Sequence, residues 1–138
     1  MNNLDNFVKK LRNSGLRPTK QRIKICEVLF TPEKTFHFTI SDLTKIIQEK
    51  QTEKISLATV YNTVHAFKKK GYLKEISIAA DKSYFDTNVS EHHHFFDVKG
   101  NEIIDIDSSK IQLKNIPNPP NGKSIKDIDV IIKVENDT

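Results

Sequence analysis

Cysteine is nearly absent from this chain of 138 residues, and tryptophan is missing altogether. The single cysteine, Cys26, excludes an internal disulfide framework and any zinc site built from four cysteines. No apolar run approaches the ~20 residues that a membrane-spanning helix needs, and the first residues lack the apolar stretch of a signal peptide. We therefore expect a cytoplasmic protein with no membrane partner.

Histidine is also scarce, and its distribution is uneven. Three of the five histidines are consecutive, at His92, His93 and His94, inside an apolar stretch typical of a strand. The other two are His37 and His65. Because imidazole nitrogens readily bind metal ions and haem iron, the triplet is the first candidate for a ligand site.

The two halves of the chain carry net charges of opposite sign. Residues 1–75 contain 15 Lys and Arg against 7 Asp and Glu, whereas residues 76–138 contain 7 against 11. A basic half is typical of nucleic-acid binding, and an acidic half suits cation binding. Solvated helix surface accounts for the same charges equally well, so charge alone does not decide between them.

Apolar periodicity and capping residues predict an N-terminal winged helix-turn-helix domain. The predicted helices are residues 3–13, a second opening at Pro18-Thr19 and ending before Pro32, a third capped by Thr39 or Ser41, and 57–70 between Ser56 and Gly71. Residues 72–78 and 82–86 then predict a hairpin, which is the wing. On the second helix we expect Ile23, Cys26 (or Val28) and Phe30 to face the core, so Cys26 is not a reactive thiol.

The fourth helix is the predicted DNA-recognition helix. Side chains near the N-terminus of such a helix reach base edges in the major groove. The residues expected to contact DNA are Ala58, Thr59, Tyr61 and Asn62 on this helix, with Arg17 and Arg22 on phosphates. Tyr61 is equally compatible with core packing, and His65 is expected on the surface or facing a phosphate.

The second half predicts a small α/β unit. Its expected elements are strands 93–98 and 103–106 around the turn 99–101, a short helix 108–113, a Pro-rich loop 117–122 and a last strand 125–134. Three strands and one helix leave an apolar face uncovered, and a second copy of the chain would cover it. We therefore expect a homodimer, with a tetramer as the alternative.

The histidine triplet is expected to belong to a metal site. Alternate residues of a strand share a face, so His92 and His94 point together and His93 points the opposite way. Asp86 ends the preceding strand, and Asp105 lies where antiparallel pairing would bring it beside His94. Imidazole and carboxylate ligands together suit Fe(II), Mn(II) or Zn(II) and disfavour calcium or magnesium. A polar surface cluster is the alternative.

Several segments together resemble the ferric uptake regulator superfamily. They are Gly15-Leu16-Arg17-Pro18-Thr19-Lys20-Gln21-Arg22, His37-Phe38-Thr39, Ser56-Leu57-Ala58-Thr59-Val60-Tyr61-Asn62-Thr63-Val64, Tyr84-Phe85-Asp86, His92-His93-His94 and Ile103-Ile104-Asp105. The resemblance implies a dimeric regulator that binds an operator in double-stranded DNA. It also implies that the regulatory metal ligands are His37, Asp86, His92, His94 and Asp105. The implied domains are 1–82 for DNA binding and 83–138 for dimerisation and metal or haem sensing.

The chain departs from that superfamily where most members bind a structural zinc ion. The usual Cys-x-x-Cys positions are Asp97 and Gly100, so we expect no four-cysteine zinc site. This loss, the triplet and the Pro-rich ending resemble the iron response regulator branch of alphaproteobacteria. That branch implies control of DNA binding by haem at His92, His93 and His94, and regulation of iron and haem genes. The sequence does not distinguish repression from activation.

Two other functions remain open from the residues alone. The nearer alternative is direct sensing of Fe(II) or Mn(II) at the five predicted ligands, with peroxide sensing through an oxidisable His37 or His92 as a third possibility. Two histidines and a carboxylate also form the iron site of some oxygenases. The second half is too short for the barrel and substrate pocket of such an enzyme, and a basic helical domain has no use there. We expect a protein that is not an enzyme.

Overall fold

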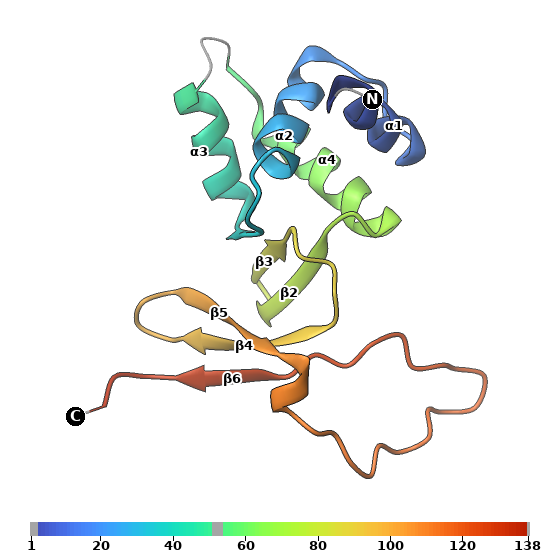
Figure 1. The fold of residues 1–138 in the computed structure, drawn as a ribbon, viewed down its shortest axis with the longest axis vertical. Helices are drawn as coiled ribbons and strands as arrows, with labels where there is room; N and C mark the ends of the chain where they lie inside the picture. The colour runs from blue at the N-terminus through green and yellow to red at the C-terminus, as the bar shows by residue number, and fades with distance from the viewer. Residues whose placement is uncertain (1–2, 51–53, 138) are drawn as a thin grey trace. The chain divides into compact units, whose positions relative to one another are not determined.

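The computed structural model describes residues 3–50 and 54–137, and the chain divides into two compact units, Met1–Val89 and Ser90–Thr138 (Figure 1). We call them the N-terminal and C-terminal units. The boundary expected between residues 82 and 83 falls at the first residue of strand β3 (Lys82–Asp86). That strand is paired on both sides within the N-terminal unit, so the division comes after it.

Within the described residues, the N-terminal unit has four helices, α1 (Asn3–Asn13), α2 (Lys20–Phe30), α3 (Ile40–Lys50) and α4 (Leu57–Lys70). Their predicted ends are confirmed. Side-chain oxygens of Thr19 and Ser56 accept hydrogen bonds from the first turns of α2 and α4, and Thr39 does the same for α3. Gly71 ends α4 with a φ of 96°, a conformation that glycine adopts without strain. None of the helices in the described part of the chain is long and apolar enough to cross a membrane.

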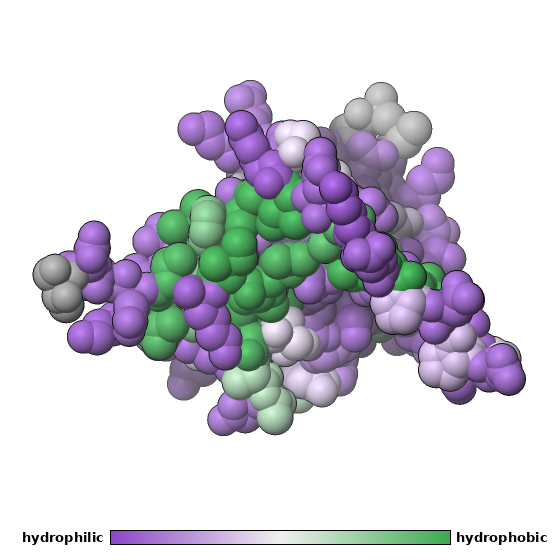
Figure 2. All heavy atoms as spheres, turned by 90° about the horizontal axis from the view of Figure 1, so that it is seen from below, coloured by the Kyte–Doolittle hydropathy of each residue, from purple (hydrophilic) through white to green (hydrophobic). Residues whose placement is uncertain are grey.

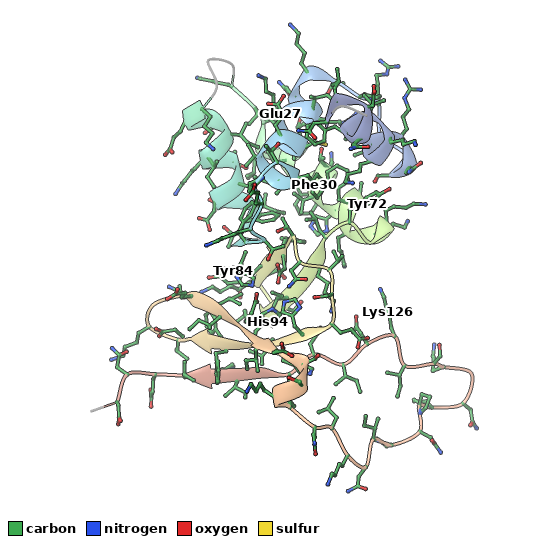
Figure 3. The ribbon with its side chains drawn as sticks, viewed as in Figure 1. Glu27, Phe30, Tyr72, Tyr84, His94 and Lys126 are labelled. Atoms are coloured by element: carbon green, nitrogen blue, oxygen red, sulfur yellow. The ribbon has the colours of Figure 1, made fainter. Side chains whose placement is uncertain are left out.

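The core of the N-terminal unit lies between these helices. Helix α2 buries Ile25, Cys26 and Leu29. Of the predicted core residues, Cys26 is confirmed, whereas Ile23 and Phe30 are only partly buried and pack against this cluster from its rim. Phe30 lies at the edge instead, with the Lys10 ammonium 5.2 Å from its ring centre (Figure 3). Cys26 is fully buried, and this burial raises the pKa of its thiol to about 12. The expected structural role of Cys26 is confirmed.

A three-stranded sheet completes the N-terminal unit, in the order β1-β3-β2. Strands β2 (Lys74–Ala79) and β3 form the predicted hairpin. Strand β1 (His37–Phe38), which is not among the predicted strands, pairs antiparallel with the other edge of β3. Two residues are too few to show an alternating pattern, and only the pairing with β3 defines them as a strand.

The C-terminal unit is built on a second sheet, in the order β5-β4-β6. Strands β4 (His92–Asp97) and β5 (Glu102–Asp107) form an antiparallel hairpin, as predicted. The Asp97 carboxylate accepts hydrogen bonds from the backbone N–H groups of Lys99 and Gly100 and so closes the turn. The third strand, β6 (Ile131–Val134), runs parallel to β4.

Two predicted elements of the C-terminal unit are shorter than expected. The helix 108–113 is a single 3₁₀ turn (Ser108–Lys110), because Ile111 is already extended. The strand 125–134 is limited to β6, which pairs only with His94–Asp97; residues 125–129 are exposed and have no strand beside them. An alternating pattern forms a strand only where it has a partner. The segment between the 3₁₀ turn and β6, which includes Lys126, is an irregular loop and largely exposed (Figure 3).

Candidate metal and DNA-binding sites

The N-terminal part of α4 presents the predicted base-contacting residues to solvent. Ala58 and Asn62 are exposed, and the side chain of Tyr61 is 52% exposed. The opposite side of the helix buries Val60, Thr63 and Val64. Tyr61 therefore does not pack in the core, which was the alternative left open by the sequence. Thr59 is half-buried, and its hydroxyl lies 2.8 Å from that of Ser56 at the start of the helix.

A groove beside the start of α2 joins three of the predicted DNA contacts. Arg17, Arg22 and Thr59 line it together with Thr19, Lys20 and Gln21. One guanidinium nitrogen of Arg22 donates a hydrogen bond to the backbone carbonyl of Arg17, which keeps the Arg22 side chain close to Arg17. The first turn of α2 contains no acidic residue to oppose an anion. The groove thus combines basic side chains with a helix N-terminus, which suits a phosphate group.

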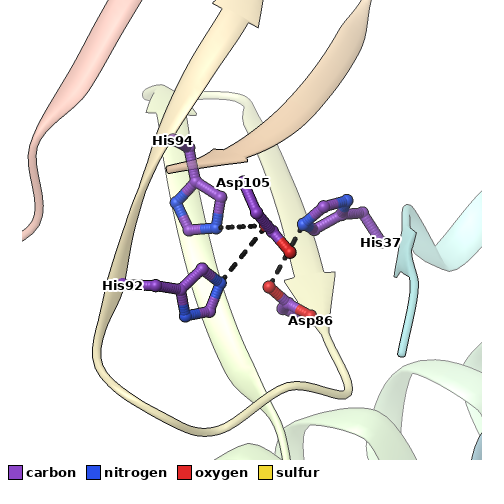
Figure 4. Close-up of side chains that lie close together, drawn as sticks. All are labelled: His37, Asp86, His92, His94 and Asp105. Atoms are coloured by element: carbon purple, nitrogen blue, oxygen red, sulfur yellow. Dashed lines mark ion pairs between the residues drawn. The ribbon is translucent and has the colours of Figure 1, made fainter. Parts of the chain in front are cut away.

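The N-terminal unit carries two of the five predicted metal ligands, and they lie side by side. His37 and Asp86 are register partners in β1 and β3. The Nε2 atom of His37 lies 3.1 Å from one oxygen of the Asp86 carboxylate (Figure 4). The other oxygen accepts a hydrogen bond from the backbone N–H of Asn88. This pair is the N-terminal half-site.

The C-terminal unit carries the other three predicted ligands. His94 and Asp105 face each other across β4 and β5, so the pairing predicted for them is confirmed. The Nε2 atoms of His92 and His94 lie 3.3 Å and 3.4 Å from the same oxygen of Asp105 (Figure 4). Both histidine side chains are buried, whereas that of Asp105 is 42% exposed. These three residues form the C-terminal half-site.

The hydrogen bond at the far side of the His92 ring shows which nitrogen is available as a ligand. Its Nδ1 atom lies 2.7 Å from the backbone carbonyl of Ser90, which can only accept, so Nδ1 carries the proton. In the neutral ring, Nε2 then has a lone pair directed at the Asp105 oxygen, which is also an acceptor. A proton or a cation between the two atoms resolves this opposition. A backbone carbonyl that fixes the ring in this way is typical of metal-binding histidines.

His93 lies on the opposite face of β4, as alternation predicts. Its Nδ1 atom accepts a hydrogen bond from the backbone N–H of Val130, and His94 donates its backbone N–H to the carbonyl of the same residue. Val130 directly precedes β6. His93 therefore joins the last strand to the hairpin and is directed away from the Asp105 side chain that His92 and His94 share.

Asp97 and Gly100 stand where most members of the superfamily that this chain resembles have zinc-binding cysteines. Here both residues shape the β4–β5 turn. Asp97 holds the β4–β5 turn through two backbone hydrogen bonds. A Cβ atom added to Gly100 would lie 2.8 Å from the Asp97 carboxylate. A side chain at Gly100 would therefore displace the Asp97 carboxylate that closes the turn.

Sequence reasoning missed the groups that orient these ligands. Ser90, Asn88 and Val130 act through backbone atoms, which no side-chain pattern reveals.

The contact of Tyr61 with His65 on helix α4 was also not predicted from the sequence. Its only signal in the sequence is the spacing of four residues, which brings two side chains together on a helix.

The fold and these side chains together define the class of this protein. A winged helix-turn-helix unit is followed by a small α/β unit, and both carry histidine and carboxylate side chains in close pairs. The chain belongs to the Ferric uptake regulator family, whose model matches residues 13–132.

Relatives and solved structures agree with this assignment. The chain is 32% identical over 102 residues to the peroxide-responsive repressor PerR of Staphylococcus epidermidis, a match that covers 74% of this chain and 66% of that protein, just under two thirds. It is 33% identical over 105 residues to a ferric uptake regulation protein of Yersinia pestis, covering 75% and 70%. The ferric uptake regulator of Pseudomonas aeruginosa with manganese has the same fold, with a TM-score of 0.69 at 23% identity over 96% of this chain and 98% of that one.

Proposed function

We propose that this protein is a DNA-binding transcription regulator whose DNA affinity is controlled by a divalent metal ion, Fe(II), Mn(II) or Zn(II). The proposed ligands are His37 and Asp86 of the N-terminal half-site with His92, His94 and Asp105 of the C-terminal half-site. The observation that carries the proposal is the convergence of the Nε2 atoms of His92 and His94 on one oxygen of Asp105, at 3.3 Å and 3.4 Å. Mixed imidazole and carboxylate donors suit these three ions. Family membership and the manganese in the Pseudomonas aeruginosa relative support the same choice.

The DNA-binding part of the proposal is supported by the N-terminal unit. Ala58, Tyr61 and Asn62 are exposed at the start of α4, where a helix in the major groove contacts bases. The groove lined by Arg17 and Arg22 suits the adjacent phosphates. Binding through so many cations is expected to weaken steeply as salt increases.

The C-terminal unit supports a homodimer as the working form. Apolar side chains remain exposed on it, and Figure 2 shows apolar residues (green) gathered on the face of the molecule in view. The exposed apolar residues of this unit are Val98, Ile104, Leu113, Ile116, Ile125, Ile128 and Ile132. Burying such a face against a second copy is the usual solution for soluble proteins. The two recognition helices of the dimer would then contact the two halves of a DNA operator.

A ligand set drawn from both units provides the means of control. Each half-site is formed within its own unit, by neighbouring strands. An ion that takes ligands from both would restrict how the units are arranged, and the spacing of two recognition helices in a dimer depends on that arrangement. A difference of ~1–3 kcal/mol in ion affinity between the DNA-competent and incompetent forms would change DNA affinity by roughly 5- to 150-fold.

Control by haem at His92, His93 and His94 is the second candidate. The observation in its favour is the replacement of the zinc-binding cysteines by Asp97 and Gly100, a feature of the iron response regulator branch. Against it, His93 is directed away from the other two histidines and its Nδ1 is already engaged by Val130. We therefore rank a divalent ion first, the reverse of the order that the sequence resemblance gave.

DNA binding with and without each signal tests the proposal. Metal-stripped protein would first select duplexes from a randomised pool in the presence and absence of Mn(II), and the affinity for the selected duplex would be measured by fluorescence anisotropy. We expect Mn(II) or Fe(II) to change this affinity and haemin to leave it unchanged. A response to haemin alone, lost in a variant with alanine at His92, His93 and His94, would establish the second candidate.

Two variants on β5 make the metal test specific. Asp105→Asn keeps the shape of the side chain but removes its charge from the C-terminal half-site. Glu102→Gln makes the same chemical change at an exposed position of the same strand. We expect the first variant to lose the response of DNA affinity to metal and the second to keep it. Equal behaviour of the two variants would contradict the assigned site.

A further inference from the structure

Tyr61, the exposed aromatic residue of the recognition helix, is held by a neighbour on its own helix. The ring centres of Tyr61 and His65 are 4.1 Å apart, and the rings are inclined at 43°. The two residues are four positions apart, which brings their side chains together on a helix. His65 is half-buried although Tyr61 is 52% exposed, so His65 lies between the solvent and the core.

The other side of the His65 ring rests on the core of the same unit. Its edge meets the ring of Phe85 at 85°, with ring centres 5.5 Å apart. Phe85 is 2% exposed and stacks on Phe38, its register partner in β1, at 5.8 Å. Edge-to-face and stacked pairs at these two separations, 5.5 Å and 5.8 Å, are favourable arrangements of aromatic rings. An exposed side chain is thus connected by one imidazole to two buried phenylalanines.

This contact matters because a freely rotating tyrosine is a poor reader of DNA. An exposed aromatic side chain samples several rotamers, and fixing one of them upon binding weakens the complex. A side chain that is already held in place avoids that loss. The imidazole of His65 restricts the ring of Tyr61 through direct contact, and Phe85 restricts the imidazole in turn.

We propose that His65 is a positioning residue for DNA recognition: it holds the Tyr61 ring in the orientation in which that ring contacts a base. The inference rests on the proposed DNA-binding function. It replaces the expectation that His65 is a surface or phosphate-facing residue. His65 is assigned no direct contact with DNA, and its effect on binding passes through Tyr61.

A double-mutant cycle on the duplex selected by the wild-type protein tests this. Affinities would be measured for wild type, Tyr61→Ala, His65→Ala and the double variant at one salt concentration. Each duplex would also be made with uracil in place of thymine at single steps, which removes only the 5-methyl group. If Tyr61 contacts a methyl, the wild type should lose about fourfold in affinity at that step, the value for burying one such group.

The expected result is specific to a positioning role. His65→Ala should weaken binding by about 2- to 10-fold and reduce the thymine–uracil difference, and it should have no further effect once Tyr61 is alanine. His65→Phe, which keeps a ring at the same place, should restore both quantities. Thermal unfolding followed by circular dichroism would verify that every variant is folded.

Three outcomes would overturn the proposal, and they have different meanings. If His65→Ala and wild type have equal affinity and equal thymine–uracil discrimination, His65 does not position Tyr61, and the proposed DNA-binding function is unaffected. Weakening by His65→Ala that persists in the Tyr61→Ala background would show that His65 contacts DNA itself. Failure of the wild type to select any duplex, with and without metal, would remove the proposed DNA-binding function and the inference with it.

Discussion

The N-terminal and C-terminal units of this chain are stabilised in different ways. In the N-terminal unit, fourteen of the described residues form one buried cluster between helices whose ends are capped. In the C-terminal unit, the buried apolar residues among those described are Phe96, Ile103 and Ile106. Beside them the hairpin buries three histidines, which are polar.

This contrast indicates what each unit requires from outside itself. A closed core of helices is stable without a partner, as is typical of small domains with one buried cluster. A three-stranded sheet with exposed apolar side chains has little core of its own. A metal ion and a second copy of the chain are the two additions that we propose for it, and both would stabilise it by binding only the folded form.

The largest expected effect is in the core of the N-terminal unit. Phe67 is fully buried, and Phe67→Ala should lower the free energy of unfolding by about 3–5 kcal/mol because a large cavity replaces the ring. Leu57→Ala, on the same helix at a position that is 59% exposed, should change it by less than ~0.5 kcal/mol. Urea unfolding followed by circular dichroism measures both. Similar values for the two variants would contradict the assignment of the core.

A smaller effect is expected where His93 joins β6 to β4. His93→Phe preserves an aromatic ring but removes the acceptor for the Val130 N–H, which should cost about 1–3 kcal/mol locally. Trypsin should then cut faster after Lys114 and Lys123, in the irregular loop before β6, while cleavage within the N-terminal unit is unchanged. Mass spectrometry of a timed digest gives both rates. An unchanged rate in this loop would show that the hydrogen bond does not hold β6.

The smallest effect is expected at an ion pair between α4 and β2. Burial alone would raise the pKa of Glu75, but hydrogen bonds from Ser83 and Lys68 and the charge of Lys68 outweigh it and lower this pKa. A lowered pKa stabilises the fold above the pKa of the unfolded chain and ceases to do so as the pH falls through the folded value.

Glu75→Gln should therefore reduce stability by less than ~1 kcal/mol at neutral pH, since the carboxylate is partly exposed. The difference from wild type should be full above the ordinary pKa of glutamate, about 4.3, and should be lost as the pH falls below it through the lowered pKa of the folded state. Thermal melts across this pH range measure it. A difference that grew on acidification would contradict the direction of the pKa shift.

The N-terminal unit was predictable because local signals agree with its packing. Thr19, Ser56 and Gly71 mark helix ends through local hydrogen bonds and backbone conformation, and the structure has these helix ends at the predicted positions. The core side of α2 was not predictable from its apolar residues, since Ile23, Ile25, Leu29 and Phe30 surround much of the helix. Only packing against neighbouring elements selects among them.

The C-terminal unit was less predictable because its elements depend on distant partners. Alternation over residues 125–134 is a valid strand pattern, yet only Ile131–Val134 has β4 beside it. Strand alternation and pairing brought His92, His94 and Asp105 together, whereas His37 came only from the family resemblance. The carbonyl of Ser90 and the N–H of Val130, which orient His92 and His93, came only from the structure.

The most direct test of the account is a titration of metal-stripped protein with Mn(II), in which free Mn(II) is followed by electron paramagnetic resonance. Wild type, His37→Ala and Asp105→Asn would be compared, with Glu102→Gln as the control. If one ion takes ligands from both units, each of the first two changes should weaken binding by at least about tenfold, and the control should bind like wild type. Wild-type affinity in His37→Ala would contradict the central claim, because the C-terminal half-site would then be sufficient on its own.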